Sequence, residues 1–254
     1  MSHAKPQYFW ASWLKRVSPK FVTPISRCYH NLMKPFLVII ISPPGGGKGT
    51  QADLLAEKFG LFHLETSKII EERFKKADPS DLIIAREKEN WLGGKLVNQA
   101  IVAGWLLGEI EKKAQAGIGI VLSGSPRSLE EVEAEMPRIE ELYGRDNIRV
   151  IEIKLSEDES VKRNSHRRIC KANRHPIPNF PEYRNITACP QDGSEIITRA
   201  LDEPEIIKER YRVYLKETAP VLEHLIQHGY QIISVNGEQP IEKVFEDILG
   251  NFND

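Results

Sequence analysis

Cysteine is scarce in this 254-residue sequence, which contains only Cys28, Cys170 and Cys189. Three cysteines cannot build the set of paired disulfides that stabilises small secreted domains. The opening residues also contain no apolar core of the kind that a secretory signal peptide carries. We therefore expect the protein to work in a reducing, cytoplasmic setting.

Long apolar runs are absent as well. The longest one, around residues 36–41, is far shorter than the roughly 20 residues of a membrane-spanning helix. Hydrophobic residues make up 41% and charged residues 28% of the chain, which is ordinary for a globular protein. The length suits one α/β core with insertions, or two small domains.

Charge is nearly balanced overall but unevenly distributed. Residues 1–34 contain six lysines and arginines and no acidic residue, which leaves 29 basic and 36 acidic residues in the remainder, a net charge of −7. An enzyme that binds nucleic acid is more often basic. The acidic body, with arginines gathered at a few points, therefore favours a small anionic ligand over nucleic acid.

The basic segment 1–34 is rich in aromatic residues, is interrupted by prolines and shows no clear periodicity. It could be a membrane-surface or partner-binding arm, a transit peptide, or a disordered extension. Met33 could also be the true start, since a phosphate-binding strand commonly opens such a chain. We expect residues 1–33 to be dispensable for catalysis.

Glycine is concentrated in residues 42–51, which read SPPGGGKGTQ. This segment follows the apolar run directly and opens a helical pattern in which Leu54, Leu55 and Phe59 share one face. Glycines let backbone N–H groups approach phosphate oxygens, and the helix N-terminus adds its dipole. Lys48 is expected to reach the outer phosphates, with Thr50 near Mg²⁺. The pattern predicts a site for a nucleoside triphosphate.

Predicted strands and helices alternate from position 36 onward. The strands are expected at 36–41, 61–64, 118–122, 148–155 and 230–235. Helical patterns occupy 47–59, 67–76, 79–92, 97–116, 128–142, 156–168, 203–228 and 241–249. This alternation is typical of a parallel sheet covered by helices on both faces, with ligands beyond the carboxyl ends of the strands. Residues 170–200 interrupt it and predict a separate small lobe.

The glycine loop resembles the adenylate kinase motif G-x-P-G-x-G-K-G-T-Q at every position except Ser42. Further similar segments extend over about residues 34–252. The resemblance implies an α/β fold with a parallel-sheet P-loop kinase core of three α/β/α layers, made of residues 35–64, 95–162 and 201–254. It also implies a helical insertion at 65–94 that binds the nucleoside monophosphate (NMP), and a small lid domain at 163–200.

The same resemblance implies roles for individual residues. The catalytic cations are expected to be Lys48, Arg127, Arg167, Arg199 and Arg210. The expected ATP-binding residues are Gly45, Gly46, Gly47, Lys48, Gly49, Thr50 and Arg163. The expected NMP-binding residues are Thr66, Lys68, Lys95, Val97, Gly124, Arg127 and Glu131. Phosphoryl transfer needs positive charge around three equatorial oxygens, which the planar fork of arginine supplies.

Cys170, Cys189 and Asp192 have the offsets of the zinc-binding lids found in some adenylate kinases. Asn173 stands at the second ligand position, and asparagine is a poor zinc ligand. His175 could take its place if the turn allows. In family members without zinc, polar residues at these four positions form hydrogen bonds instead. The sequence thus leaves both a structural Zn²⁺ and a metal-free lid open.

The acceptor side departs from the family pattern at three places. The motif T-G-D-x-x-R appears as TSKIIE at 66–71, so that Lys68 and Glu71 exchange the usual charges. Ser123 stands in place of the aspartate that orients the waters of magnesium in this family. Glu131 stands in place of the glutamine that reads the acceptor adenine.

Together these features imply Mg²⁺-dependent transfer of the γ-phosphate of ATP to AMP, forming two ADP. We expect a monomer whose partners are ATP and a nucleoside monophosphate. Two alternatives stay open: a kinase with another acceptor, and a nucleotide-binding relative with weak or no catalysis. Retention of the whole arginine set argues against a pure binder, which has little use for transition-state charge.

Overall fold

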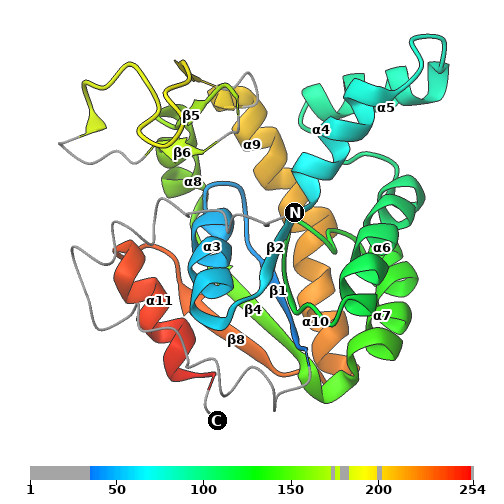
Figure 1. The fold of residues 1–254 in the computed structure, drawn as a ribbon. Coiled ribbons are helices and arrows are strands. Elements are labelled where there is room, and N and C mark those ends of the chain that lie inside the picture. The colour runs from blue at the N-terminus through cyan, green and yellow to red at the C-terminus, as the bar shows by residue number, and fades with distance from the viewer. Residues whose placement is uncertain (1–34, 173–174, 178–182, 199–201, 253–254) are drawn as a thin grey trace.

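The computed structural model describes residues 35–172, 175–177, 183–198 and 202–252. Within them, a five-stranded sheet in the order β2-β3-β1-β4-β8 forms the centre of the molecule (Figure 1). All of its strand pairs are parallel. The predicted α/β class with a parallel-sheet P-loop core is therefore confirmed. The segment 1–34 lies outside the described residues.

The strands of this sheet are β1 (Leu37–Ile41), β2 (Phe62–Glu65), β3 (Ile120–Ser123), β4 (Ile148–Lys154) and β8 (Ile232–Asn236). The helices around it are α3 (Lys48–Phe59), α6 (Gln99–Gln115), α7 (Leu129–Tyr143), α10 (Ala219–Gln227) and α11 (Ile241–Gly250).

Strand β1 is buried along its whole length because helices cover both faces of the sheet. Leu37, Ile39 and Ile41 pack into a cluster with side chains from α6, α7 and α10. Val38 and Ile40 point to the opposite face and pack against α3 and α11. Successive side chains of a strand alternate between faces, so a continuous apolar run suits a central strand covered on both sides.

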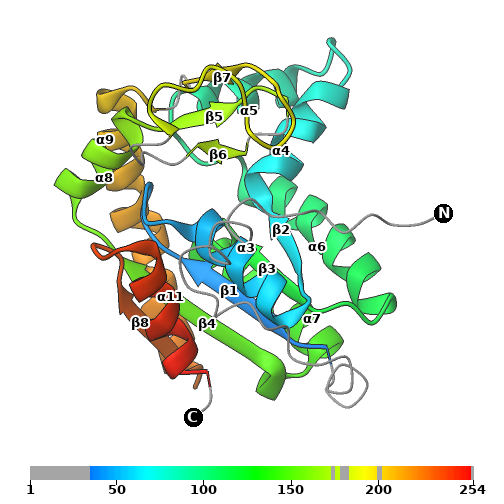
Figure 2. The same ribbon diagram turned by 60° about the vertical axis from the view of Figure 1, so that its left-hand side comes forward.

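Two smaller parts stand on the same end of this core (Figures 1 and 2). One consists of α4 (Thr66–Lys76) and α5 (Leu82–Leu92). The other follows α8 (Glu157–Ser165) and contains the antiparallel sheet β6-β5-β7, with β5 at Arg168–Cys170, β6 at Pro176–Ile177 and β7 at Ile196–Ile197. Helix α9 (Pro204–Val213) leads back into the core.

Several predicted boundaries were wrong for local reasons. Helix α5 begins at Leu82 and not at 79, because the Asp81 carboxylate accepts hydrogen bonds from the two amides that follow Leu82. Helix α6 begins at Gln99, with Asn98 as its N-cap. The helix predicted over 156–168 ends at Ser165, because the next residues form strand β5. The last strand lies at Ile232–Asn236, two residues beyond the predicted start.

The single long helix predicted at 203–228 is interrupted by a π-helical turn, η5 (Tyr214–Thr218), between α9 and α10. A π-turn inserts one extra residue into a helix and is frequent at functional sites. Here Tyr214 and Thr218 both line the cleft described below. No described helix is long and apolar enough to cross a membrane.

Candidate active site

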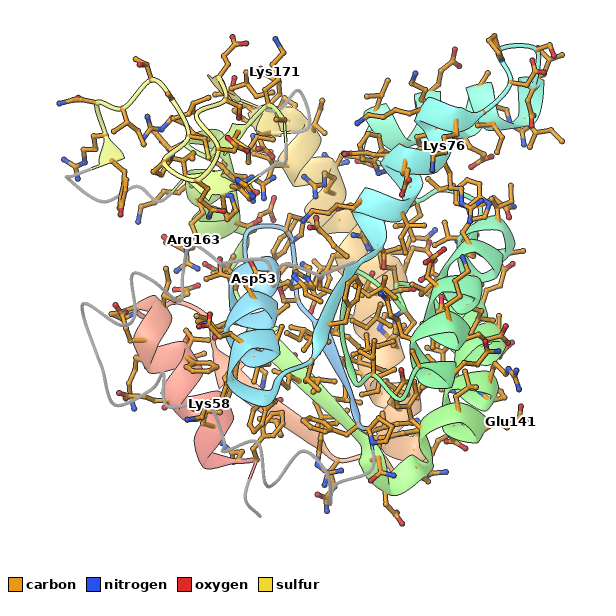
Figure 3. All side chains as sticks on the ribbon, viewed as in Figure 1. Asp53, Lys58, Lys76, Glu141, Arg163 and Lys171 are labelled. Atoms are coloured by element: carbon orange, nitrogen blue, oxygen red, sulfur yellow. The ribbon has the colours of Figure 1, made fainter. Side chains whose placement is uncertain are left out.

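A cleft of about 470 Å³ lies at the carboxyl end of the parallel sheet. Its lining comes from the glycine loop after β1, from the first residues of α4, and from α8, β5 and α9. Residues far apart in the sequence thus meet at the edge where ligands of open parallel sheets bind. Figure 3 shows Arg163 on α8 near the loop-bearing end of α3, which carries Asp53.

The glycine loop turns into α3 through a left-handed residue. Gly47 has φ 86° and ψ 12°, a conformation that costs glycine little, and it directly precedes Lys48. The Lys48 Nζ donates to the carbonyl oxygens of Ser42 (2.7 Å) and Pro43 (2.9 Å), and lies 3.2 Å from the Ser42 hydroxyl. Serine at position 42 thus takes part in holding the lysine over the loop.

Four cations converge on this loop. Burial is the main cause that lowers the pKa of Lys48 well below its usual value, followed by the charges of Arg127, Arg210 and Arg167. Burial likewise lowers the pKa of Arg127. Because like charges destabilise one another when close, this arrangement is costly without an anion between them. The cleft is therefore suited to a polyphosphate.

Two of these arginines contact one buried acid. The Arg167 Nε and Nη2 donate to the two carboxylate oxygens of Asp202, at 2.9 and 2.5 Å. The Arg210 Nη1 lies 3.8 Å from the same carboxylate, which is 4% exposed. Asp202 thus holds both guanidinium groups toward the cleft. A separate acid, Glu159, accepts from the Arg163 Nε at 2.8 Å.

Arg127 is held from several directions. Its Nε donates to the Gly124 carbonyl at 2.7 Å. Its backbone N–H donates to the Glu131 carboxylate at 2.7 Å, and its backbone carbonyl accepts from the Thr218 hydroxyl at 2.8 Å. These contacts fix the backbone of Arg127 and direct its guanidinium along the cleft.

Behind Arg127 lies a buried acidic pair, Glu131 and Glu135. The Ser125 hydroxyl lies 2.8 Å from a carboxylate oxygen of each. One hydroxyl proton can serve only one acceptor, so the geometry calls for a protonated carboxyl in the pair. Burial is the main cause that raises the pKa of Glu131, and it raises the pKa of Glu135 well above its usual value.

His63 joins two polar groups at the floor of the cleft. Its Nδ1 lies 2.7 Å from the Asp53 carboxylate, and its Nε2 lies 2.7 Å from the Ser123 hydroxyl. Glu65 lies two residues further along β2, in register with Ser123 on β3. Its carboxylate accepts from the Ser67 hydroxyl at 2.5 Å and lies 3.3 Å from the Lys68 Nζ.

The lobe around β5 brings together Cys170, His175, Cys189 and Asp192, whose potential ligand atoms all lie within 4.8 Å of one another. The His175 Nδ1 is 3.5 Å from each cysteine sulfur and 3.3 Å from Asp192 Oδ2. Burial raises the pKa of Cys189 and lowers that of His175. Of the fourth positions that the sequence left open, His175 lies in the cluster, whereas Asn173 lies outside the described residues.

The structure brings most of the predicted site residues into one cleft. Its lining includes Gly45, Gly47, Lys48, Gly49, Thr50, Lys68, Lys95, Gly124, Arg127, Arg163, Arg167 and Arg210. Gly46 packs against Ser42, Val97 lies in the apolar cluster between α4 and α6, and Thr66 and Glu131 are buried outside the lining. Arg199 lies outside the described residues.

Sequence reasoning missed Asp53, His63, Glu65 and Asp202, all of which contact the predicted site. No local pattern marks them, because their partners come from other strands and helices. The one available signal was the alternation of β2, which places His63 and Glu65 on the same face.

This fold and cleft define a nucleotide-dependent phosphotransferase, because a glycine loop, a lysine and converging arginines face one ligand space. Comparison with known proteins narrows the class. The family model described as adenylate kinase matches residues 40–230, and the chain therefore belongs to the adenylate kinase family.

Curated relatives agree with this family. The adenylate kinase of Elusimicrobium minutum is 36% identical over 215 residues, covering 84% of this chain and 96% of that protein. Those of Methanothrix thermoacetophila and Bacillus subtilis are each 32% identical, covering 83% of this chain and 95% of the respective relative. The protein is accordingly a nucleoside monophosphate kinase of the adenylate kinase type.

Proposed function

We propose that the protein transfers the γ-phosphate of MgATP to AMP and forms two ADP. The observation that carries this proposal is the convergence of Lys48, Arg127, Arg167 and Arg210 on one cleft. Phosphoryl transfer needs two nucleotides in line and positive charge around the transferred group. The relatives named adenylate kinase support AMP as the acceptor.

We assign the donor and acceptor to opposite sides of the cleft. On the donor side, the loop amides and Lys48 bind the outer phosphates, and Arg163 packs on the adenine. On the acceptor side, Arg127 binds the phosphate of AMP beside Lys68 and Lys95. Arg167 and Arg210 contribute charge from the lid side, together with Arg199. In this division, residues 65–94 form the NMP-binding part and 163–200 the lid.

Mg²⁺ enters as part of the MgATP substrate, where it neutralises charge on the β- and γ-phosphates. Magnesium prefers oxygen ligands. Thr50 lines the cleft in the first turn of α3, and its hydroxyl oxygen is suited to that ion. Glu131, at the position where the family pattern has glutamine, is buried and hydrogen-bonded to Ser125, so the acceptor base is tested directly by comparing nucleotides.

A coupled assay of ADP formation with AMP, CMP, UMP and GMP tests the proposal. We expect MgATP-dependent turnover with AMP and a lower kcat/KM for the other three acceptors. A higher kcat/KM for another nucleotide would make that nucleotide the preferred acceptor in place of AMP, and the protein would still be a nucleoside monophosphate kinase. Nucleotide binding without ADP formation from any of the four would overturn it.

We further propose that Cys170, His175, Cys189 and Asp192 hold a structural Zn²⁺. Zinc takes such sulfur, nitrogen and carboxylate ligands in a tetrahedron with bonds of about 2.0–2.3 Å, and neighbouring ligand atoms then lie roughly 3.3–3.8 Å apart. The contacts of 3.3–3.5 Å found here fit that spacing. A histidine kept neutral by burial is also the form that binds a metal.

Metal analysis tests this second proposal on the purified protein. We expect about one equivalent of zinc, and a lower unfolding temperature after chelation that added zinc restores. Cys170→Ser should lose both the metal and the effect of the chelator. The proposal would be contradicted if the purified protein contains no metal and neither chelator nor added zinc changes its unfolding temperature. That result would favour a hydrogen-bonded lid.

A monomer in the cytoplasm stays our expectation from the sequence. Light scattering with and without nucleotide measures the oligomeric state, and a stable dimer would contradict that expectation.

A further inference from the structure

The cleft is rich in cations and poor in anions. Among the described residues that line it, Asp53 and Glu65 are the only carboxylates. Asp53 is engaged with His63, at 2.7 Å from its ring nitrogen. A divalent cation that enters the cleft with its nucleotide needs oxygen ligands from the protein, either directly or through water. Glu65 also has partners, Ser67 and Lys68, but of the two carboxylates it is the one that stands at the carboxyl end of a strand of the central sheet.

Glu65 occupies a specific place relative to Ser123. The two residues end adjacent parallel strands and are partners in the β2–β3 register. Adjacent strands lie about 4.8 Å apart, and a glutamate side chain is one methylene longer than an aspartate. A glutamate at position 65 can therefore bring its carboxylate near the space that a carboxylate on the end of β3 would reach.

The position of Glu65 relative to the cations supports this reading. The charge of Glu65 raises the pKa of Lys48 against burial and three arginines, and together with Glu131 it raises the pKa of Arg127 against burial. Its carboxylate thus lies within electrostatic range of the two residues assigned to the donor and acceptor phosphates. A cation that bridges phosphate oxygens would lie in the same region.

Ser123 completes the arrangement through His63. In the tautomer in which the His63 Nδ1 donates to the Asp53 carboxylate, the His63 Nε2 accepts the hydrogen of the Ser123 hydroxyl. The oxygen of Ser123 then keeps its lone pairs as hydrogen-bond acceptors. Bound water on a cation is a donor, so this orientation of the hydroxyl suits it.

We propose that Glu65, assisted by Ser123, orients the Mg²⁺ of the bound MgATP, so that the carboxylate for this task has moved from the end of β3 to the end of β2. The proposal rests on the function proposed above. Glu65 acts here as a positioning residue that accepts hydrogen bonds from the water ligands of the ion. Ser67 and Lys68 hold its side chain from the first turn of α4.

The test measures metal affinity, so that it does not depend on turnover. Mn²⁺ is titrated into the enzyme with bound ATP and followed by electron paramagnetic resonance. In Glu65→Gln, which keeps the shape and an acceptor for Ser67, we expect Mn²⁺ affinity to fall by ~10-fold or more, as for other residues that support metal ligands. ATP affinity without metal should change less than about 3-fold, since Glu65 acts through the ion.

Two further variants sharpen the test. The exchange Glu65→Ser with Ser123→Asp returns the carboxylate to β3 and should recover most of the Mn²⁺ affinity. Glu72→Gln is the matched control, because it removes a carboxylate from an exposed pair with Lys76 further along α4 and should keep the wild-type Mn²⁺ affinity. Wild-type Mn²⁺ affinity in Glu65→Gln, with an unchanged unfolding temperature, would overturn the proposal and leave Glu65 a purely structural role at the start of α4. Failure of the wild type to form ADP would instead overturn the proposed function.

Discussion

Arg167 and Asp202 form a bidentate ion pair in which two guanidinium nitrogens face two carboxylate oxygens at 2.9 and 2.5 Å. Asp202 is almost fully buried, and Arg210 lies near the same carboxylate. One acid thus restrains two of the cations assigned to the transferred phosphate. Since a pre-positioned charge loses little freedom on binding, the pair orders the cleft before the ligand arrives.

Asp202→Asn should lower the stability of the protein without nucleotide by about 1–3 kcal/mol, because Arg167 and Arg210, which are both partly buried, lose their shared anionic partner. ATP should then raise the unfolding temperature of the variant more than that of the wild type, since phosphate replaces the lost anion. Thermal unfolding with and without ATP measures both effects. Glu205→Gln, which breaks an exposed pair with Lys208, is the control, and equal ATP shifts in Asp202→Asn and wild type would contradict this account.

Lys48→Met should reduce turnover by about 10²–10³-fold, the loss typical of one charge-stabilising donor. The fold should survive, because the hydrogen bonds of this side chain to described residues go to the carbonyls and hydroxyl of its own loop. Removing a charge crowded by three arginines should leave stability equal or higher. Steady-state kinetics and thermal unfolding test this, with Lys58→Met on the same helix as the control. Full activity in Lys48→Met would exclude the assigned role.

Arg127→Ala should raise the KM for the acceptor by roughly 10–100-fold, the value of a charge-assisted hydrogen bond. The backbone there is held by Glu131 and Thr218, so the variant loses mainly the guanidinium. Lys68→Ala should raise the same KM less than about 5-fold, because its side chain is half exposed and pairs with Glu65. Initial rates at varied acceptor concentration measure both values. A larger increase in KM for Lys68→Ala than for Arg127→Ala would mean that α4, and not Arg127, binds the acceptor phosphate.

The buried acids behind Arg127 predict a pH dependence of stability. Burial raises the pKa of Glu135 well above that of the unfolded chain. A group whose pKa is raised by folding contributes its full stability below the unfolded pKa, near 4.3 for glutamate, and loses it as pH rises through the folded pKa. The contribution of Glu135 should therefore decline from about pH 4.5 upward.

Glu135→Gln removes this titration and keeps an acceptor for Ser125. We expect the variant to be more stable than the wild type at pH 8 by about 1 kcal/mol or more, since one pKa unit corresponds to about 1.4 kcal/mol. The difference should shrink toward pH 5. Urea unfolding at both pH values measures it, and Glu133→Gln on the exposed face of the same helix is the control. A difference that is independent of pH would mean that Glu135 does not change its protonation there.

Much of the glycine-loop side of the cleft could be predicted from the sequence because its signals are local. The apolar run 37–41, the glycine loop and the helix that follows are contiguous, so spacing alone places Lys48 and Thr50 beside the loop. The arginines on α8 and α9 were found by their agreement with one family pattern. In a parallel sheet the segments that follow the strands start at the same edge, and Arg163 and Arg210 both line the cleft at that edge.

Tertiary structure alone decided which groups meet across the fold. Glu65 lies opposite Ser123 because β2 pairs with β3, and His63 reaches Asp53 because α3 packs beside β2. Asp202 meets Arg167 across 35 positions of chain, and potential ligand atoms of Cys170, His175, Cys189 and Asp192 lie within 4.8 Å of one another. The spacing of residues in the sequence shows only which residues are neighbours along the chain. Strand register and helix packing are set when the apolar faces of different elements are buried against one another. Those faces, packed against one another, brought Asp202 to Arg167 and Arg210, and His63 to Asp53 and Ser123.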